Sequence, residues 1–277
     1  MIILISKYRD MKPNANILLT SITCLLFFIT FQEGAFAQDK SEVIYQCAPC
    51  GCNSDGKHFD KPGNCKDCGM KLVAVTEPFS HLKNLDKPMN VAILLIYHAQ
   101  VLDYAGPYDV FTSAGSKNFN VYTVGATKEP ITTMPNLSVN PQYSILDSPK
   151  PDILIIPGGM WTSVGEETLE WIKENSKEAD YTFSVCTGAF ILAEIGILDN
   201  LEATTHAAGV DILEKKYPAI KKVHRNKRFI DNGKVITSAG VSAGIDASFH
   251  LIERILGNEW VRAISNNLEY KYEPTEN

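Results

Sequence analysis

Cys186 is the residue of this chain whose surroundings most clearly predict chemistry. It follows a short β-favouring stretch, 181–185, and precedes an amphipathic helical stretch, 187–195, with the small residues Ser184 and Gly188 two positions to either side. A sharp strand-to-helix turn needs such small neighbours and presents its central residue as a nucleophile. The N–H groups at the start of the helix would favour a thiolate and lower the pKa of the thiol. The alternative is a buried cysteine that acts only as a small apolar side chain.

A second group of cysteines, nearer the N-terminus, has the spacing of a metal site. Cys47 and Cys50 form one C-x-x-C pair, and Cys65 and Cys68 form another. Two such pairs separated by a short loop are typical of a structural Zn²⁺ site of the ribbon type. We expect these four thiolates to bind one zinc ion, with Cys52 outside the ligand set. A pair of disulfides is the alternative in an oxidising compartment.

The first 37 residues have the features of a secretory signal peptide. Lys12 precedes an almost unbroken apolar stretch, 17–31, and Ala35-Phe36-Ala37 follows it as a small-x-small cleavage site. The apolar stretch is short for a membrane span. We therefore expect a secreted protein, periplasmic in a Gram-negative source, with no stable membrane insertion after the signal is removed.

Length and composition fit one sizeable domain and one small one. The chain has 277 residues, 45% of them hydrophobic and 21% charged, with a net charge of -6 that argues against a nucleic-acid partner. The small module cannot hold a core of its own without a staple such as a metal ion. We expect four segments: a signal peptide at 1–37, a zinc-ribbon-like module at 38–76, a linker at 77–88 and the main domain at 89–277.

The main domain alternates between strand and helix patterns. Continuous apolar runs such as 91–97 and 152–156 predict buried strands, and Gly106-Pro107 is expected to open a helix. This alternation predicts a mostly parallel sheet covered by helices on both faces. Ligands bind such sheets at the carboxyl ends of the strands, where Asp103, Gly159 and Cys186 are expected.

The cysteine-rich segment resembles the heavy-metal-binding domain family over about thirty residues. The matching positions include both members of the second cysteine pair and the first cysteine of the first pair: Tyr45, Cys47, Pro62, Gly63, Cys65, Cys68, Gly69, Met70 and Leu72. Cys50 stands where that family usually has histidine. The added thiolate should favour Zn²⁺ or another soft ion.

The main domain resembles the DJ-1/PfpI superfamily, and within it the isonitrile hydratase-like branch that also forms the sensory half of certain AraC-type regulators. The motifs that carry the resemblance span residues 89–270 in order: Leu102 to Phe111, Ile156 to Gly159, Val185 to Phe190, Ala203 to His206, and Ser242 to Asp246. The resemblance implies a flavodoxin-like three-layer sandwich, usually a homodimer, with no cofactor in the catalytic domain. It also implies that Cys186 is the catalytic cysteine and Asp103 its acidic partner.

The resemblance and the chemistry of the neighbouring residues both bear on the reaction. Proteolytic members carry histidine directly after the cysteine, so Thr187 argues against a protease. A carboxyl group buried beside the thiol should have a raised pKa, which would keep Asp103 protonated and able to shuttle protons. The N–H groups of Gly159 and Thr187 could hold developing negative charge. For His206 we expect a hydrogen-bonded structural role.

Three functions remain open from the sequence. The first is cysteine-dependent hydration of a small electrophile, with an isonitrile giving an N-substituted formamide. The second is glyoxalase-like processing of aldehydes with the same cysteine and carboxylate. The third is a non-catalytic binding or sensing module for small molecules or metal stress.

The expected signal peptide gives the first testable prediction. Amino-terminal sequencing of the protein from its native host should begin near Gln38, because the small-x-small site precedes that residue. A mature protein that retains residues 1–37 would contradict it.

Overall fold

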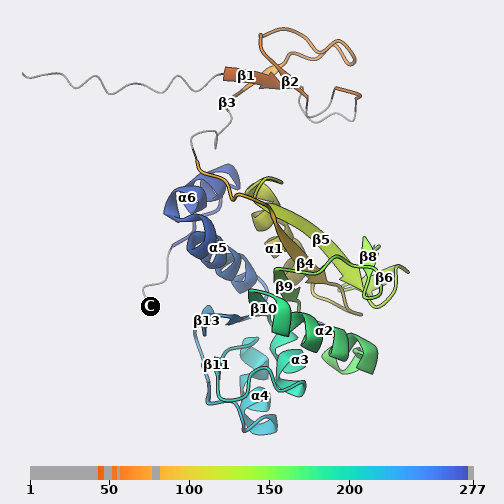
Figure 1. Ribbon diagram of the computed structural model, residues 1–277, viewed down its shortest axis with the longest axis vertical. Coiled ribbons are helices and arrows are strands. Elements are labelled where there is room, and N and C mark those ends of the chain that lie inside the picture. The colour runs from red at the N-terminus through yellow and green to blue at the C-terminus, as the bar shows by residue number, and fades with distance from the viewer. Residues whose placement is uncertain (1–42, 47–51, 55–56, 77–81, 274–277) are drawn as a thin grey trace, which may run out of the picture. The chain divides into compact units, whose positions relative to one another are not determined.

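The computed structural model describes residues 43–46, 52–54, 57–76 and 82–273 (Figure 1). The expected signal peptide lies outside these residues, and so do Cys47 and Cys50. Within the described part of the chain, every helix is too short or too polar to cross a membrane.

The main domain is built on a seven-stranded sheet in the order β13-β14-β10-β9-β4-β5-β8. Its six strands from β14 to β8 run parallel, and β13 is antiparallel to β14 at one edge. The strands are β4 (Met89–Leu94), β5 (Phe119–Gly125), β8 (Tyr143–Ser144), β9 (Ile153–Ile156), β10 (Tyr181–Val185), β13 (Phe229–Asp231) and β14 (Val235–Ser238).

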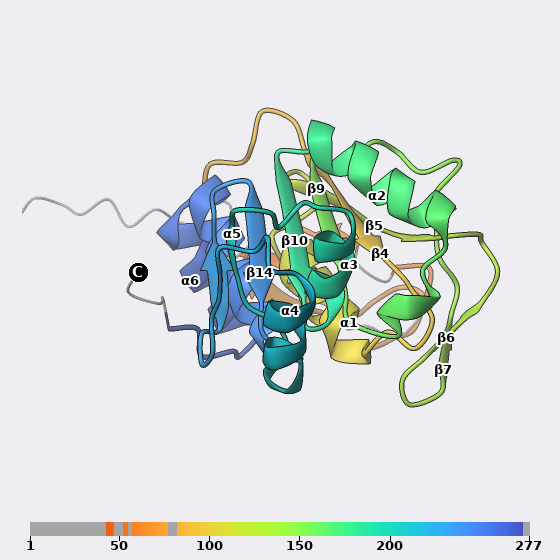
Figure 2. The same cartoon turned by 90° about the horizontal axis from the view of Figure 1, so that it is seen from below.

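Helices cover both faces of this sheet (Figures 1 and 2). One face carries α1 (Val101–Ser113), α5 (Ala243–Leu256) and α6 (Asn258–Asn267), which pack against one another. The other face carries α2 (Glu166–Glu178) and α3 (Gly188–Glu194). The flavodoxin-like three-layer sandwich predicted from the sequence is therefore confirmed.

Short elements complete the domain. They are the β6 (Ile131–Thr133) and β7 (Leu137–Val139) hairpin, the parallel pair β11 (Glu202–Ala203) and β12 (Lys222–Val223), the helix α4 (Val210–Lys216), and the 3₁₀ turns η1 (Trp161–Ser163) and η2 (Ala207–Gly209).

The central strands are apolar on both faces because helices cover both. All four residues of β9 are completely buried, and β4 is buried from Val91 onward. This explains why these segments are continuous Val, Ile and Leu runs instead of alternating patterns. The rigid centre of the sheet brings the carboxyl ends of β4, β9 and β10 to one edge.

The helix after β4 starts earlier than the sequence predicted. Gln100 is the N-cap of α1, and its side-chain oxygen accepts a hydrogen bond from the Val101 N–H. Pro107 therefore lies inside the helix and not in its first turn, where we had expected it. A proline there removes the helical donor to the Asp103 carbonyl. The early start places Asp103 in the first turn, directly at the carboxyl edge of the sheet.

The strand-to-helix turn at Cys186 has the predicted geometry. β10 ends at Val185, α3 begins at Gly188, and Cys186 between them adopts a φ of 58°. Positive φ is costly for a residue with a Cβ and is characteristic of strained functional turns. A Cβ on Gly188 would lie 2.3 Å from the Ile156 carbonyl oxygen, so α3 can pack this close to β9 only with glycine there.

The segment expected to be a linker is partly integral to the main domain. Leu82 is buried in its core, and the Lys83 carbonyl accepts a hydrogen bond from Trp260 Nε1. The Leu85 N–H donates to Asn118 Oδ1. The main domain thus extends N-terminally of residue 89, and a truncation that preserves it should retain residues from 82 onward.

The cysteine-rich module forms a three-stranded antiparallel sheet in the order β2-β1-β3. Its strands are β1 (Val43–Gln46), β2 (His58–Phe59) and β3 (Val73–Thr76). Among the side chains that the structure describes in this module, Cys65 and Leu72 are buried together, with Tyr45, Cys52 and Phe59 packed around them.

The close approach at Gly188 predicts that Gly188→Ala destabilises the fold. The added methyl group must displace the β9 backbone, so we expect the free energy of unfolding to fall by about 2 kcal/mol or more. Urea unfolding measures this. Gly165→Ala is the matched control, because no atom lies within 4 Å of a Cβ at Gly165, and it should cost under about 1 kcal/mol. Equal effects of the two substitutions would contradict the packing argument.

Candidate active site and cysteine cluster

Asp103 and Cys186 come together at the carboxyl edge of the sheet, as predicted. Asp103 is completely buried, and Cys186 is 7% exposed. Both side chains converge on Gly158, since a Cβ there would lie 2.7 Å from Asp103 Oδ2, 2.7 Å from Cys186 Cβ and 2.8 Å from the Thr187 nitrogen. The Gly158 N–H donates a 3.0 Å hydrogen bond to Asp103 Oδ2. Only a glycine permits this approach.

The other carboxyl oxygen of Asp103 keeps an open acceptor position. Oδ1 is buried, and it has no hydrogen-bond partner of ordinary geometry among the described residues. Buried polar atoms without partners are costly and rare, and in native proteins they often have a catalytic role. The carboxyl group as a whole contacts the Cys186 thiol, so it can accept the thiol proton.

Burial raises the pKa of Asp103 to about 7, as expected in direction. Desolvation is the largest cause, and the Cys186 thiol and the Gly158 and Val241 N–H groups act in the opposite direction. A carboxyl group with a pKa near neutrality can both accept and return a proton at physiological pH.

The expected lowering of the Cys186 pKa is wrong. Burial, and after it the Asp103 charge, raise the pKa of this thiol to about 12, and the opposing Thr187 and Val241 N–H groups do not offset them. Helix α3 is only 7 residues long, and its first N–H groups do not outweigh a buried carboxylate. The carboxyl group therefore ionises before the thiol, the reverse of the expected order, and the two groups titrate as a coupled pair.

A hydrogen bond joins Gly159 to Thr187, the residue directly after Cys186. The Gly159 N–H donates a 3.0 Å hydrogen bond to Thr187 Oγ1, so it is already engaged in this arrangement. The Thr187 N–H instead faces the Cys186 sulfur. Of the two donors expected to hold negative charge, Thr187 is thus the one turned toward the reacting atom.

Val241 is a site residue that the sequence interpretation missed. It follows β14, and its N–H faces both Asp103 and Cys186. Its φ of 58° is unusual for a β-branched residue and indicates backbone strain held by the surroundings. The only sequence signal was a run of small residues, 238–244, after a predicted strand.

His206 agrees with the structural role expected for it. Its Nδ1 accepts a hydrogen bond from the Ala208 N–H at the start of η2. Its ring packs so closely on Gly240 that a Cβ there would lie 2.3 Å from His206 Cδ2. The ring thereby supports the loop that carries Val241.

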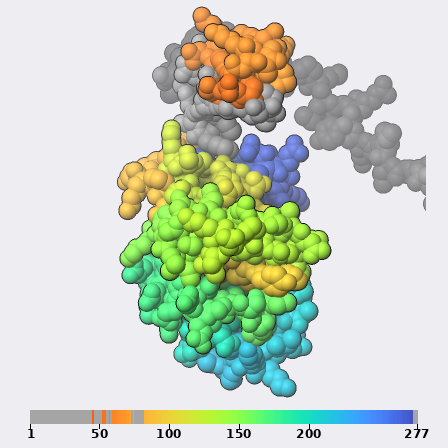
Figure 3. All heavy atoms as spheres, turned by 90° about the vertical axis from the view of Figure 1, so that its right-hand side faces the viewer, coloured from red at the N-terminus to blue at the C-terminus, as the bar shows by residue number. Residues whose placement is uncertain are grey.

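Two exposed apolar side chains lie on the loops at the same edge of the sheet. Tyr97 follows β4 and is 48% exposed, and Met160 follows β9 and is 43% exposed. The Met160 N–H donates to the Tyr97 carbonyl, which joins the two loops. In Figure 3 the segment after β4 reaches the surface as a yellow-orange strip beside the yellow-green atoms of the β5–β8 region. These side chains could receive an apolar substituent of a substrate.

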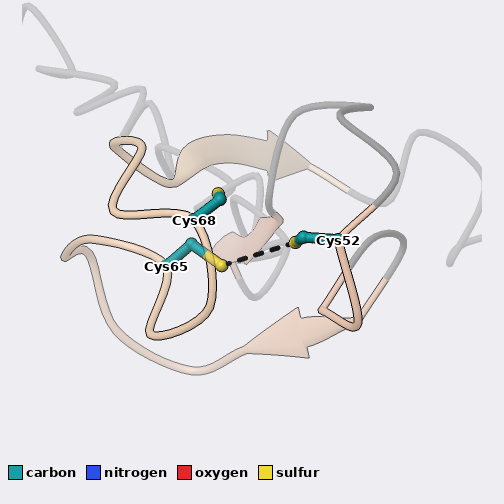
Figure 4. Close-up of side chains that lie close together, drawn as sticks. All are labelled: Cys52, Cys65 and Cys68. Carbon is teal, nitrogen blue, oxygen red and sulfur yellow. Dashed lines mark hydrogen bonds between the residues drawn. The ribbon is translucent and has the colours of Figure 1, made fainter.

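Three of the cysteines that the structure describes in the cysteine-rich module lie together. The Sγ atoms of Cys52, Cys65 and Cys68 all lie within 4.8 Å of one another (Figure 4). Cys65 and Cys68 were expected in this cluster, but Cys52 was expected outside it. Three thiol groups are a donor set suited to a soft metal ion.

Comparison with known proteins decides the family of the main domain. The family model described as DJ-1/PfpI family matches residues 89–254, and the one described as heavy metal binding domain matches residues 44–75. The chain belongs to the DJ-1/PfpI family. The resemblance found from the motifs is thereby confirmed.

Two relatives illustrate the range of this family. Isonitrile hydratase from Pseudomonas putida is 32% identical over 191 residues, which cover 67% of this chain and 80% of the relative. The HTH-type transcriptional regulator GbdR from Pseudomonas aeruginosa is 24% identical over 190 residues, 66% of this chain and 51% of the regulator. The same domain thus occurs in an enzyme and in a regulator.

Solved structures share the fold. A THiJ/PfpI family protein from Pseudomonas syringae superposes with a TM-score of 0.62 at 25% identity, over 72% of this chain and 81% of that one. Drosophila melanogaster DJ-1beta gives a TM-score of 0.58 at 18% identity, over 67% of this chain and all of that one.

The coupling of the two buried groups predicts how Asp103→Asn changes the thiol. Removing the carboxylate charge should lower the Cys186 pKa, because that charge is one of the causes that raise it. The pH midpoint for alkylation of Cys186 by iodoacetamide should therefore shift to lower pH. Measuring the alkylation rate against pH by mass spectrometry tests this.

Asp109→Asn is the control, since Asp109 lies on the same helix but is exposed. It should leave the midpoint unchanged. An unchanged or higher midpoint in Asp103→Asn would show that the carboxylate does not act on the thiol.

Proposed function

We propose that this protein hydrates isonitriles, with Cys186 as the nucleophile and Asp103 as the proton carrier. The observation that carries the proposal is the buried pair itself, a thiol and a carboxyl group that contact each other and converge on Gly158. The similarity to isonitrile hydratase across 80% of that protein supports the choice of substrate. The exposed Tyr97 and Met160 suit an organic substituent.

The first half of the reaction forms a covalent intermediate. The Asp103 carboxylate removes the thiol proton as Cys186 Sγ bonds to the isonitrile carbon, and the same carboxyl group delivers that proton to the carbon. The product is a thioimidate on Cys186. A carboxyl pKa of about 7 allows Asp103 to perform both transfers near neutral pH.

Water completes the reaction. Its oxygen adds to the thioimidate carbon while Asp103 takes one water proton and returns it to the nitrogen. The carbon–sulfur bond then breaks, the hydroxyl proton returns to Cys186 through Asp103, and an N-substituted formamide leaves. In the overall reaction, one isonitrile and one water give one N-substituted formamide. The Thr187 N–H stabilises the departing thiolate.

A binding function without turnover is the second candidate. Regulators such as GbdR contain the same domain, and this chain covers about half of that protein. In that case the exposed apolar loops would bind a small molecule and the dyad would not react.

The proposal also covers the location of the protein, its metal ion and its oligomeric state. We keep export through the signal peptide at 1–37, Zn²⁺ as the ion of the cysteine-rich module, and a homodimer. The module's match to the heavy metal binding domain supports the metal. An apolar hollow of about 530 Å³ along α1 supports the homodimer as a face for a second copy, and neither member of the dyad lines it.

The proposed reaction predicts a covalent adduct and a formamide product. After incubation with a small alkyl isonitrile, intact mass should rise by one isonitrile in wild type, and chromatography should detect the formamide. Cys186→Ala should do neither. The rate should increase as pH rises through about 7, because the ionised form of Asp103 takes the thiol proton.

Other outcomes identify the alternatives. Conversion of a 2-oxoaldehyde but of no isonitrile would favour glyoxalase-like chemistry. Thermal stabilisation by a small molecule, without adduct or product, would favour the binding module.

A further inference from the structure

Cys52 lies where a metal ligand would lie. Its Sγ is 3.8 Å from Cys65 Sγ (Figure 4). A disulfide would need about 2.05 Å between the sulfur atoms. Four sulfurs at about 2.3 Å from a zinc ion form a tetrahedron whose edges are about 3.8 Å long. The observed separation is that of an S–H···S hydrogen bond between two thiols, and it equals the separation of two thiolates that share one metal ion.

The backbone around Cys65 and Cys68 has the form of a metal knuckle. The Gly69 N–H donates to the Cys65 carbonyl at 2.9 Å, and Gly69 adopts a φ of 75°. The Cys65 N–H donates to the Met70 carbonyl at 2.7 Å. These bonds close a tight turn that keeps Sγ of Cys65 and Cys68 within 4.8 Å of each other.

A separate hydrogen bond ties the Cys52 turn to this knuckle. Ser54 Oγ donates to Asp67 Oδ2 at 2.6 Å, and Ser54 is 7% exposed although the module is small. Asp67 lies between Cys65 and Cys68 in the sequence, and Ser54 lies two residues after Cys52. This bond spans the two segments that supply the thiols, which is the arrangement of an outer-shell contact that orients ligands.

We propose that Cys52, Cys65 and Cys68 supply three thiolate ligands to one thiophilic ion, Zn²⁺ or Cu⁺, and that the bond between Ser54 and Asp67 positions Cys52. The inference rests on the proposed metal-binding role of the module and changes its ligand set. Cys52 enters the set, although the two C-x-x-C pairs left it out. Thiolates select such soft ions over Mg²⁺ and Ca²⁺.

The test uses the reduced, metal-stripped chain and two metal probes. Co²⁺ replaces Zn²⁺ as a spectroscopic probe, because its sulfur-to-metal charge-transfer absorbance scales with the number of bound thiolates. Competition with chromophoric chelators for Zn²⁺ and for Cu⁺ gives the affinities separately and distinguishes the two ions. The variants are Cys52→Ser and Asp67→Ala, with Asp60→Ala as the control because Asp60 is an exposed acid in the same module.

The proposal predicts a different result for each variant. Cys52→Ser should lose the charge-transfer absorbance of one thiolate and bind the ion at least 10-fold more weakly. Asp67→Ala should retain the absorbance but bind about 10-fold more weakly, as loss of an outer-shell partner does. Asp60→Ala should match wild type.

Three results would overturn the inference or a part of it, and each removes a different claim. If wild type binds one ion and Cys52→Ser has the same absorbance and affinity, Cys52 is not a ligand and only this inference fails. If wild type binds neither ion, the proposed metal-binding role fails with it. An Asp67→Ala variant that binds as tightly as wild type would remove the positioning role of the Ser54 contact.

Discussion

The chemistry of the candidate active site depends on one constraint, which is that a carboxyl group and a thiol are buried side by side. A low-dielectric site disfavours charge on either group, and charge on one disfavours charge on the other. Asp103 and Cys186 therefore hold one readily lost proton between them, with the carboxyl pKa near 7 and the thiol pKa near 12. Such a pair stays unreactive until a substrate carbon forms a bond with the sulfur and the substrate takes up the thiol proton.

Three parallel strands bring this pair together, and their order explains the arrangement. β4 leads into α1 and delivers Asp103, β10 leads into α3 and delivers Cys186, and β9 lies between them and delivers Gly158. Any side chain on Gly158 would separate the two groups. The apolar centre of the sheet thus fixes a polar contact at its edge, which is where parallel sheets place their sites.

The features that could be predicted from the sequence are those that local residue patterns determine. The strand 181–185, the turn at Cys186 and the position of Asp103 at the carboxyl edge depend on short apolar runs and small residues, and all were found. The start of α1 was missed because proline is more common in the first turn of a helix than inside it. Val241 and the order of ionisation depend on burial by distant segments, which a single sequence does not encode locally.

In the cysteine-rich module, too, local spacing predicts one part of the site and the fold determines the rest. The pair Cys65 and Cys68 was predicted from its spacing and the following glycine. Cys52 reaches the cluster only because antiparallel pairing of β1 with both β2 and β3 brings distant turns together. Spacing identifies ligands within one turn, whereas the fold decides which turns meet.

The proposed proton transfers depend most directly on the protonation state of Asp103. Carbon-13 NMR of protein labelled at aspartate Cγ measures this as a titration shift, with Asp103→Asn used to assign the signal. We expect a midpoint near pH 7 for Asp103 in the wild-type protein. A midpoint near 4, the value of an ordinary solvated aspartate, would contradict it.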